Sequence, residues 1–199
     1  ENAAIKLHVA EGCVVRRNLI RDTHQASGIW LDWLNVNSRV TQNVIVNTGT
    51  VRAGIFVEAS LATNSVDHNV IWDCRISRNP EFYPRETGGF GVLTTESRNL
   101  IVAHNLIAQC EGAAVMLGLG DPNRRVKGQP SESHGHSVTG NIILDCATPV
   151  VLPNVTNSCD FNVYGGVNSN TVWRVEQPEN RVGLREWRET LKFDAGGCA

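Results

Sequence analysis

The feature that most constrains this chain is an internal repeat. An asparagine followed by aliphatic residues recurs at steps of 25, 26, 36, 36 and 21 residues. A second frame recurs in phase with it, as "AIKLH" (4–8), "GIWLD" (28–32), "GIFVE" (54–58), "GVLTT" (91–95) and "AVMLG" (114–118). Self-similarity of this kind is typical of a protein built from stacked repeats. The repeated asparagines are Asn18, Asn43, Asn69, Asn105, Asn141 and Asn162.

Short β-branched strands in units of about 25 residues, separated by turns of Asn, Gly and Asp, predict an all-β fold, a right-handed parallel β-helix. Alternation within each frame predicts that Ile29 and Leu31 point inward and that Trp30 and Asp32 point outward. The repeating Asn is expected in a turn, where its side chain tolerates left-handed backbone and bonds to the next coil. The competing two-layer α/β repeat fails, because no unit holds an uninterrupted helical period.

The repeat divides the chain. Residues 1–166 are expected to form β-helix coils, as a fragment of a longer β-helix. Polar, Gly/Pro-rich insertions at about 75–90 and 120–136 lengthen two coils, and they are either walls of a binding groove or plain surface excursions. Residues 167–199 are expected to form a C-terminal tail. There the segment 182–191 places Leu184, Trp187 and Leu191 on one face of a short packing helix.

Composition excludes several classes of protein. The net charge of −2 comes with no basic stripe, so a nucleic-acid partner is not expected. No apolar run approaches the ~18 residues of a membrane span. The first residue is Glu1 and no signal-like segment follows, so the compartment is not read from the start; a secreted or periplasmic location is favoured over the cytoplasm.

Neither cysteine nor histidine predicts a metal site or a cofactor. No C-x-x-C pair occurs. Three cysteines each follow the repeat Asn by five residues, which predicts core filling along the stack. The histidines form no convincing ligand set, and those of "HGH" are expected to be solvated. The cysteines are Cys74, Cys110 and Cys146, and the histidines are His68, His104, His134 and His136.

The repeat is expected to bring several polar and charged side chains into one column. Stacked coils are about 4.8 Å apart, so His8, Asp32, Glu58 and Thr95 are expected side by side on the outer face. Two neighbouring carboxylates repel, so the pair is predicted to serve a function or to have a cationic partner. Two other interpretations are a chance surface feature and half of a Ca²⁺ site completed by an aspartate. The candidate aspartates are Asp22 and Asp73. Glu96 beside the column either joins the pocket or faces solvent, and the second is favoured.

Two carboxyl groups about 5–5.5 Å apart suit retaining glycoside hydrolysis, in which one attacks the anomeric carbon and the other transfers a proton. Their proximity also raises one pKa, which keeps a general acid protonated. Trp30 and Phe56 on the same outer face, with Trp33 at its edge, are expected to supply an exposed platform for a sugar. Lys6 and His8 from the preceding coil are expected to bond sugar hydroxyls or to tune the acids.

These residues resemble a known family. "AIKLH", "GIWLDW", "RVTQNVIVN" and "IFVEAS…VDHNVIWD" resemble the β-helix of glycoside hydrolase family 120 β-xylosidases, as do "DFNVYGG" and "LREWRE" near the C-terminus. The resemblance implies that Asp32 is the nucleophile, that Glu58 is the general acid/base and that His8 belongs to a subsite. The turn "TGTVRAG" is longer than in that family. The family also carries further domains, including a β-sandwich, so activity of this segment alone is not assured.

Three functions therefore remain from the sequence. The first is a retaining glycosidase acting on β-linked oligosaccharides, β-xylosidase-like and suited to xylan degradation. The second is a polysaccharide lyase or C5-epimerase acting on uronates, which needs basic residues or Ca²⁺ beside the acids. The third is a carbohydrate-binding β-helix without catalysis. In each case the expected partner is an oligosaccharide, with no nucleic acid, membrane or cofactor.

Overall fold

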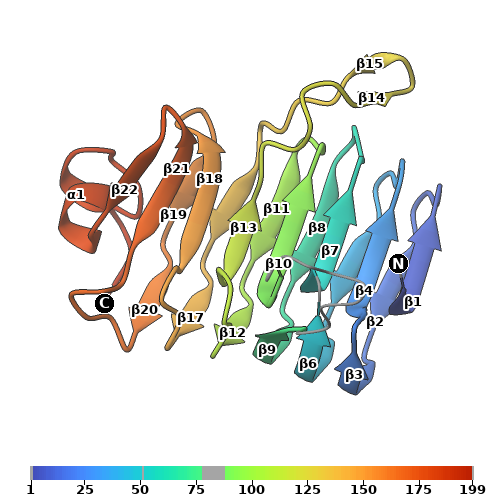
Figure 1. The fold of residues 1–199 in the computed structure, drawn as a ribbon, viewed down its shortest axis with the longest axis horizontal. Coiled ribbons are helices and arrows are strands. Elements are labelled where there is room, and N and C mark those ends of the chain that lie inside the picture. The colour runs from blue at the N-terminus through green and yellow to red at the C-terminus, as the bar shows by residue number, and fades with distance from the viewer. Residues whose placement is uncertain (1, 51, 78–87, 199) are drawn as a thin grey trace.

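The protein is an all-β parallel β-helix, as the repeat predicts (Figure 1). The computed structural model describes residues 2–50, 52–77 and 88–198. Each coil adds one strand to each of three sheets, and the strands pair in parallel from coil to coil. The coils advance from the N-terminal strand on the right of Figure 1 to the single short helix on the left.

The largest sheet has eight strands and carries the repeated "GIWLD" frame. Its strands pair in parallel except for the last two, which are antiparallel. In spatial order they are β1 (Ala3–His8), β4 (Ser27–Asp32), β7 (Ala53–Glu58), β10 (Phe90–Thr95), β13 (Val115–Leu117), β18 (Val150–Asn154), β21 (Trp173–Gln177) and β22 (Asn180–Val182).

Two further sheets of six strands close the coil. The β2-to-β19 sheet contains β2 (Val14–Arg16), β5 (Arg39–Thr41), β8 (Asn64–Asp67), β11 (Leu100–Ala103), β16 (Ser137–Thr139) and β19 (Ser158–Asp160). The β3-to-β20 sheet contains β3 (Leu19–His24), β6 (Val44–Thr50), β9 (Val70–Ile76), β12 (Leu106–Ala108), β17 (Ile142–Leu144) and β20 (Val163–Gly165).

The alternation predicted for the 8-stranded sheet is observed. Ile29, Leu31, Ile55 and Val57 are fully buried in the core inside the coil. Glycine opens three of the five frames, at Gly28, Gly54 and Gly91, and close approach between coils requires it there. A Cβ added at Gly28 would lie 2.6 Å from the carbonyl oxygen of the next coil's glycine, far inside van der Waals contact. The missing Cβ at this position therefore lets neighbouring coils approach each other closely.

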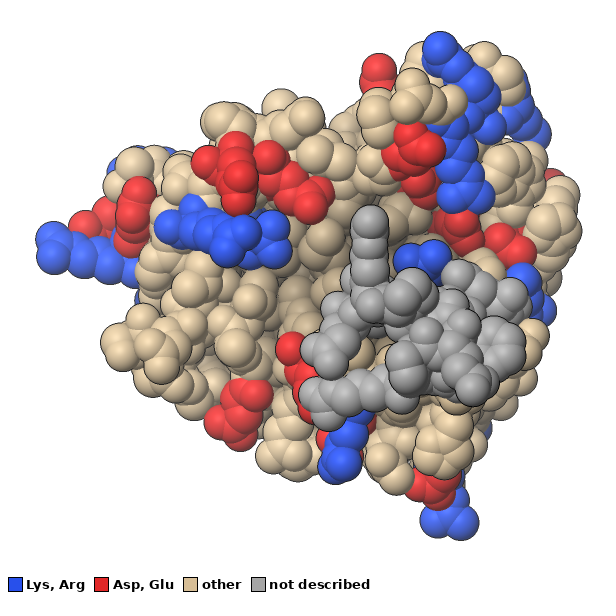
Figure 2. All heavy atoms as spheres, in the orientation of Figure 1, with Lys and Arg blue, Asp and Glu red and all other residues tan. Residues whose placement is uncertain are grey.

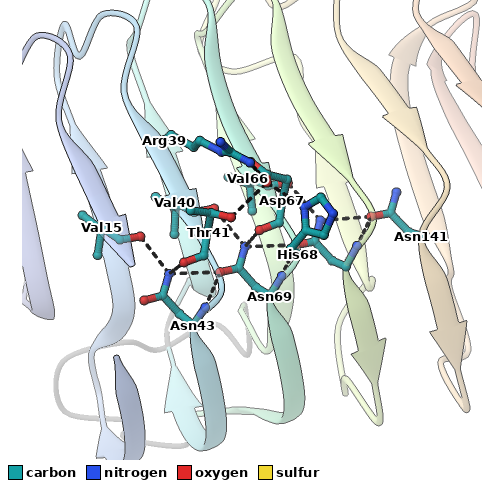
Figure 3. A network of polar contacts seen from close by, with 11 residues as sticks. Val15, Arg39, Val40, Thr41, Asn43, Val66, Asp67, His68, Asn69 and Asn141 are labelled. Carbon is teal, nitrogen blue, oxygen red and sulfur yellow. Dashed lines mark hydrogen bonds and ion pairs between the residues drawn. The ribbon is translucent and has the colours of Figure 1, made fainter. Parts of the chain in front are cut away.

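The repeated asparagines form a ladder of hydrogen bonds along the inside of the turn between the two six-stranded sheets (Figure 3). Asn69 is typical: its Nδ2 donates to the carbonyl oxygens of Val40 and Asp67 and to Oδ1 of Asn105. Its Oδ1 accepts from the backbone N–H and the side chain of Asn43. Each asparagine thus satisfies buried backbone groups at a turn and joins three coils.

One detail of the turn differs from the prediction. The ladder asparagines do not adopt left-handed backbone; the residue before each of them does, with φ between 53° at His68 and 63° at Gly140. The residue four places after each asparagine is also left-handed, as at Asp22 and Asn47. The Asn is selected for its side-chain hydrogen bonds, because an amide both donates and accepts along the stack.

A charged group lies beside the ladder at the same turn. Asp67 accepts hydrogen bonds from Arg39 Nε at 2.8 Å and from Thr41 Oγ1 at 2.9 Å, and its Oδ2 lies 2.8 Å from His68 Nδ1 (Figure 3). Burial acts to raise the pKa of Asp67, but these hydrogen bonds and the charge of Arg39 outweigh it and lower the pKa to about 2. The cluster is a structural clamp between neighbouring coils.

The cysteines fill the core, as predicted. Cys74, Cys110 and Cys146 are buried and free, and they continue a column that Thr48 occupies one coil earlier. Thr48 Oγ1 donates to Cys74 Sγ at 3.3 Å, and the backbone N–H of Cys110 donates to Cys146 Sγ at 3.4 Å.

The C-terminal tail closes the end of the coil. The helix α1 (Leu184–Glu189) is shorter than the predicted 182–191 and buries Trp187 against the last coil. Asp194, fully buried, takes the place of a seventh asparagine: its Oδ1 accepts from the backbone and side chain of Asn162. Strand β21 continues the 8-stranded sheet beyond residue 166, so the coil and the tail share this sheet.

The two insertions are described to different extents. Residues 78–87 of the insertion predicted at 75–90 lie outside the described residues. The insertion at 120–136 contains the antiparallel hairpin β14 (Arg125–Val126) and β15 (Gln129–Pro130), which projects at the top of Figure 1. Within the described parts of the chain, no helix has the length and apolar character needed to cross a membrane.

Candidate functional site

The predicted column of side chains exists. In the strand register, His8 pairs with Asp32, Asp32 pairs with Glu58, and Glu58 pairs with Thr95. Asp32 and Glu58 end strands β4 and β7, and the inward side chains of both strands are held by the core. The two carboxylates therefore stand on neighbouring parallel strands, about one strand spacing of 4.8 Å apart. Neither is fully exposed, with side chains 17% and 13% accessible.

The Asp32 carboxylate is held by the preceding coil. Lys6 Nζ lies 3.0 Å from Asp32 Oδ2, and His8 Nδ1 lies 3.3 Å from the same oxygen. Lys6 also stands over the ring of Trp30, 3.7 Å from its centroid. The positive charge of Lys6 offsets the repulsion that two stacked carboxylates would otherwise suffer. Lys6 and His8 thus contact the candidate acid itself.

The Glu58 carboxylate is held from the other side by an insertion. Arg124 Nη1 lies 2.6 Å from Glu58 Oε1 and 3.2 Å from Glu96 Oε2. The other oxygen of Glu96 accepts the backbone N–H of Asp121 at 2.9 Å. Arg124 also stacks over Trp33, with its guanidinium carbon 4.9 Å from the ring centroid. The hairpin insertion is therefore attached directly to the acid pair.

Sequence reasoning missed Arg124 and misplaced Glu96. Glu96 was expected to face solvent, but it is 4% exposed and bonded to the insertion. The only signal for Arg124 is that a polar insertion rich in Arg follows the coil of Glu96. A separation of 66 residues from Glu58 leaves no periodicity by which to pair them.

The surroundings shift the pKa of Glu58 upward. Burial is the largest cause, and the nearby charges of Asp32 and Glu96 act in the same direction. The hydrogen bond and charge of Arg124 act in the opposite direction without cancelling the rise. Glu58 therefore holds a proton at higher pH than an ordinary glutamate does, a property that general acids require.

A third acid falls in the same column. Strand β18 pairs Asn154 with Gln177 of β21, so Glu176 occupies the place in its coil that Glu58 occupies in β7. Its Oε2 accepts the backbone N–H of Leu119 at 2.7 Å. Burial raises its pKa, against the lowering effect of that hydrogen bond and of Arg174. The sequence frame fades before this coil, so the sequence analysis did not single out Glu176.

The aromatic residues point outward, but two of them are buried. Trp30 and Phe56 stack with centroids 5.4 Å apart and are 5% and 3% exposed, in a separate apolar cluster with Leu93. The prediction of an exposed platform at these two residues is therefore wrong, because alternation tells the direction of a side chain and not what covers it. Trp33 is half-buried and is the aromatic ring that contacts the acid site, through Arg124.

The described residues do not offer a metal site. No group of three or more His, Cys, Asp or Glu side chains in ranges 2–50, 52–77 and 88–198 is placed to hold an ion. Neither aspartate proposed for a calcium site contacts the acid pair: Asp22 accepts from Asn47, and Asp73 pairs with Arg75.

The sequence predicted that both histidines of "HGH" are solvated, and for His136 this is wrong. His136 is buried; its Nδ1 accepts the backbone N–H of Leu100, so Nε2 donates to Ser133 Oγ at 3.0 Å. Burial, with a smaller contribution from His134, lowers the pKa of His136 to about 4. Its role is therefore structural: both ring nitrogens are used within the fold.

The coil architecture and the outward acid column define the protein as a right-handed parallel β-helix with a candidate site on its 8-stranded sheet. Residues 1–174 match the family model described as "Periplasmic copper-binding protein (NosD)", and the chain belongs to this family. No curated protein and no solved structure matches the chain. The family match supports the β-helix and does not single out the glycoside hydrolases that the sequence resembles.

Proposed function

We propose that this protein is a carbohydrate-active enzyme, a retaining glycoside hydrolase that acts on β-linked oligosaccharides in the manner of a β-xylosidase. The observation that carries the proposal is the in-register pairing of Asp32 with Glu58. Side chains on adjacent strands are separated by about the 5–5.5 Å that retaining hydrolysis uses. Lys6 and Arg124 offset the repulsion between the two acids, so the proposal rests on the spacing of the pair and on the raised pKa of Glu58.

The surroundings of the two acids support different roles. Asp32 lies against a cation, Lys6, and is proposed as the nucleophile whose Oδ attacks the anomeric carbon as the bond to the leaving oxygen breaks. Glu58, with a raised pKa, is proposed to give its proton to that oxygen. Water then adds to the anomeric carbon while Glu58 takes back a proton, which releases Asp32. Arg124 binds Glu58 Oε1, so the transferred proton is assigned to Oε2.

Copper is named only in the description of the family model. The described residues do not provide a ligand group for it, so no step of the proposal uses copper. The same description names a periplasmic protein, and we propose a periplasmic or secreted location for this chain. A carbohydrate-active enzyme that meets plant or microbial polysaccharides outside the cytoplasm fits that location.

Azide rescue tests the two roles separately. With 4-nitrophenyl β-xyloside as substrate, Asp32→Gly is expected to lose activity and, with azide, to form the α-glycosyl azide by direct displacement. Glu58→Ala is expected to form the β-azide, because azide then attacks the glycosyl-enzyme. Asp22→Gly, at an exposed aspartate with φ 55°, is the control. If Asp32→Gly keeps the wild-type rate on aryl glycosides, the hydrolase proposal is wrong.

One observation favours a second candidate, a uronate lyase. Lys6, His8 and Arg124 all contact the acid pair, which is more basic character than the sequence analysis expected. A lyase would release unsaturated products from a polyuronate, detected by ultraviolet absorbance. Because each cation is already paired with a carboxylate, we favour the hydrolase.

A further inference from the structure

One cavity, lined in part by residues of the insertion at 120–136, has no role in the chemistry above. It has a volume of about 450 Å³ and lies between the insertion that carries the hairpin β14–β15 and the ends of strands β18 and β21. We call it the hairpin pocket. Leu119, Pro122 and Pro130 form its apolar wall, and Asn154 and Gln177 lie at the ends of the two strands.

The hairpin pocket is joined to the acid pair by direct contacts. Gly120 lines the pocket and is packed so tightly on Glu96 that an added Cβ would lie 2.6 Å from its Cγ. Glu96 shares Arg124 with Glu58. In Figure 2, acidic and basic side chains gather below the projecting hairpin, at the upper right of the molecule. The insertion that lines the pocket therefore also contacts Glu96 through Gly120, and Glu58 through Arg124.

The order of the strands places the pocket on the leaving-group side. Along the sheet the order is β4 with Asp32, β7 with Glu58, then β10, β13, β18 and β21. A nucleophile lies under the sugar that is attacked, and the acid lies at the oxygen that leaves. The direction from Asp32 to Glu58 therefore runs from the attacked sugar toward the leaving chain, and the pocket is further along it.

The distance sets which sugar reaches the pocket. Strand β13, which precedes Leu119, is two strand spacings beyond β7, and β18, which ends at Asn154, is three; at ~4.8 Å each this is roughly 10–14 Å. One sugar residue in an extended chain covers about one strand spacing. The leaving chain would thus place its second or third residue over Leu119 and Asn154.

The lining specifies the chemistry of that sugar. The amide of Gln177 can donate to and accept from hydroxyls, and the proline and leucine wall suits the C–H face of a pyranose. Asn154 Oδ1 already accepts from Thr156 and Asn157, so Asn154 offers a sugar its Nδ2 donor. Among the described residues that line the pocket there is no Lys or Arg; Glu132 adds a carboxylate and His134 an imidazole. A uronate would meet repulsion there, whereas a neutral sugar would not.

We propose that the hairpin pocket is a subsite for a neutral sugar residue of the leaving chain, two or three residues from the cleaved bond. This inference rests on the proposed function for its direction and for its substrate class. It makes the enzyme selective for oligosaccharides longer than a disaccharide, because only these reach Asn154 and Gln177.

The experiment compares xylobiose with xylotetraose in binding and in turnover. The Asn154→Ala/Gln177→Ala double variant is expected to bind xylotetraose about tenfold more weakly, since two hydrogen bonds are lost. Binding is measured by calorimetry on Asp32→Asn protein, which prevents turnover. In the active protein the ratio of kcat/KM for xylotetraose over xylobiose is expected to fall by a similar factor.

The control removes the same two amide types, one Asn and one Gln, from the insertion instead of from the strand ends. Asn123→Ala/Gln129→Ala lies at exposed positions of the hairpin that do not line the pocket. Tetrauronate is the charged probe and is expected to bind more weakly than xylotetraose.

The possible outcomes separate the subsite from the hydrolase. If xylotetraose does not bind, or binds the pocket variant and the control equally, the subsite is wrong. The same holds if the uronate binds better. Binding that depends on Asn154 and Gln177 without any hydrolysis supports the subsite and overturns the proposed hydrolase instead.

Discussion

At the scale of single residues, the site depends on how three acids share the available cations. Asp32 lies against the cation Lys6 and the imidazole of His8, whereas Glu58 and Glu96 share the guanidinium of Arg124. One guanidinium between two buried carboxylates compensates each incompletely. Burial is the main cause of the raised pKa of Glu58, and a guanidinium shared with Glu96 does not cancel that rise in spite of a hydrogen bond 2.6 Å long.

Replacing Arg124 by Gln tests this account. Arg124 lowers the pKa of Glu58 against the effect of burial, so its removal is expected to raise that pKa further. The proton then stays on Glu58 to higher pH, and the alkaline limb of the kcat/KM profile moves upward. The carboxyl titration of Glu58 by NMR measures the same shift without requiring activity.

Arg125, exposed and adjacent, provides the control as Arg125→Gln, which is expected to leave the titration of Glu58 in place. A downward shift or no shift in Arg124→Gln would contradict the lowering effect on the pKa of Glu58 that is assigned to Arg124.

At the scale of elements, the asparagine ladder holds the coils in register. The side chain of an interior member such as Asn69 makes five hydrogen bonds, within its own coil and to the coils on both sides, and Asn69 is 1% exposed. Asn18 stands in the first coil, where fewer partners surround it. The stability of such a stack is approximately a sum over neighbouring coils. An interior asparagine of the ladder should therefore contribute much more to the free energy of unfolding than a terminal one.

Asn69→Ala is expected to lower the free energy of unfolding by about 3–5 kcal/mol, because it leaves buried groups of Asn43 and backbone carbonyls without partners. Asn18→Ala is expected to cost about 1 kcal/mol. Urea denaturation followed by circular dichroism measures both. Equal losses at the two positions would contradict the role assigned to the ladder.

At the scale of the whole molecule, the stack of coils is closed at its C-terminal end by Asp194, a residue that the repeat does not predict. Asp194 Oδ2 accepts from Trp187 Nε1 at 2.9 Å and from Tyr164 Oη at 2.5 Å, while Oδ1 ends the asparagine ladder. Helix α1 is thereby attached to the last coil through one carboxylate. Asp194 is thus a C-terminal cap that connects the packing of helix α1 to the asparagine ladder.

Asp194→Ala is expected to lower the free energy of unfolding by at least about 3 kcal/mol, because several buried donors lose their acceptor together. Tyr164→Phe removes one of these donors and is expected to cost about 1 kcal/mol. In hydrogen exchange, protection should be lost first in β20 and β17, next to the cap, and last in β6 and β9. Uniform loss along the stack would refute a local cap.

Much of the fold and part of the site follow from the sequence alone, because both are periodic. The spacing of the ladder asparagines determined the coils, and alternation along "GIWLD" and "GIFVE" determined that Asp32 and Glu58 are neighbours. A period carries this information because every coil pairs with the next in one register. The frame glycines and the column of cysteines follow for the same reason.

What the tertiary structure alone decided are the contacts that break the period. Arg124 reaches Glu58 from an insertion, Glu96 is buried by that insertion, and Asp194 closes the ladder from beyond the helix. The exposure of Trp30 and Phe56 was likewise decided in three dimensions. Such contacts join residues of unrelated spacing, so their geometry depends on how a loop folds back over the sheet, which no repeat encodes.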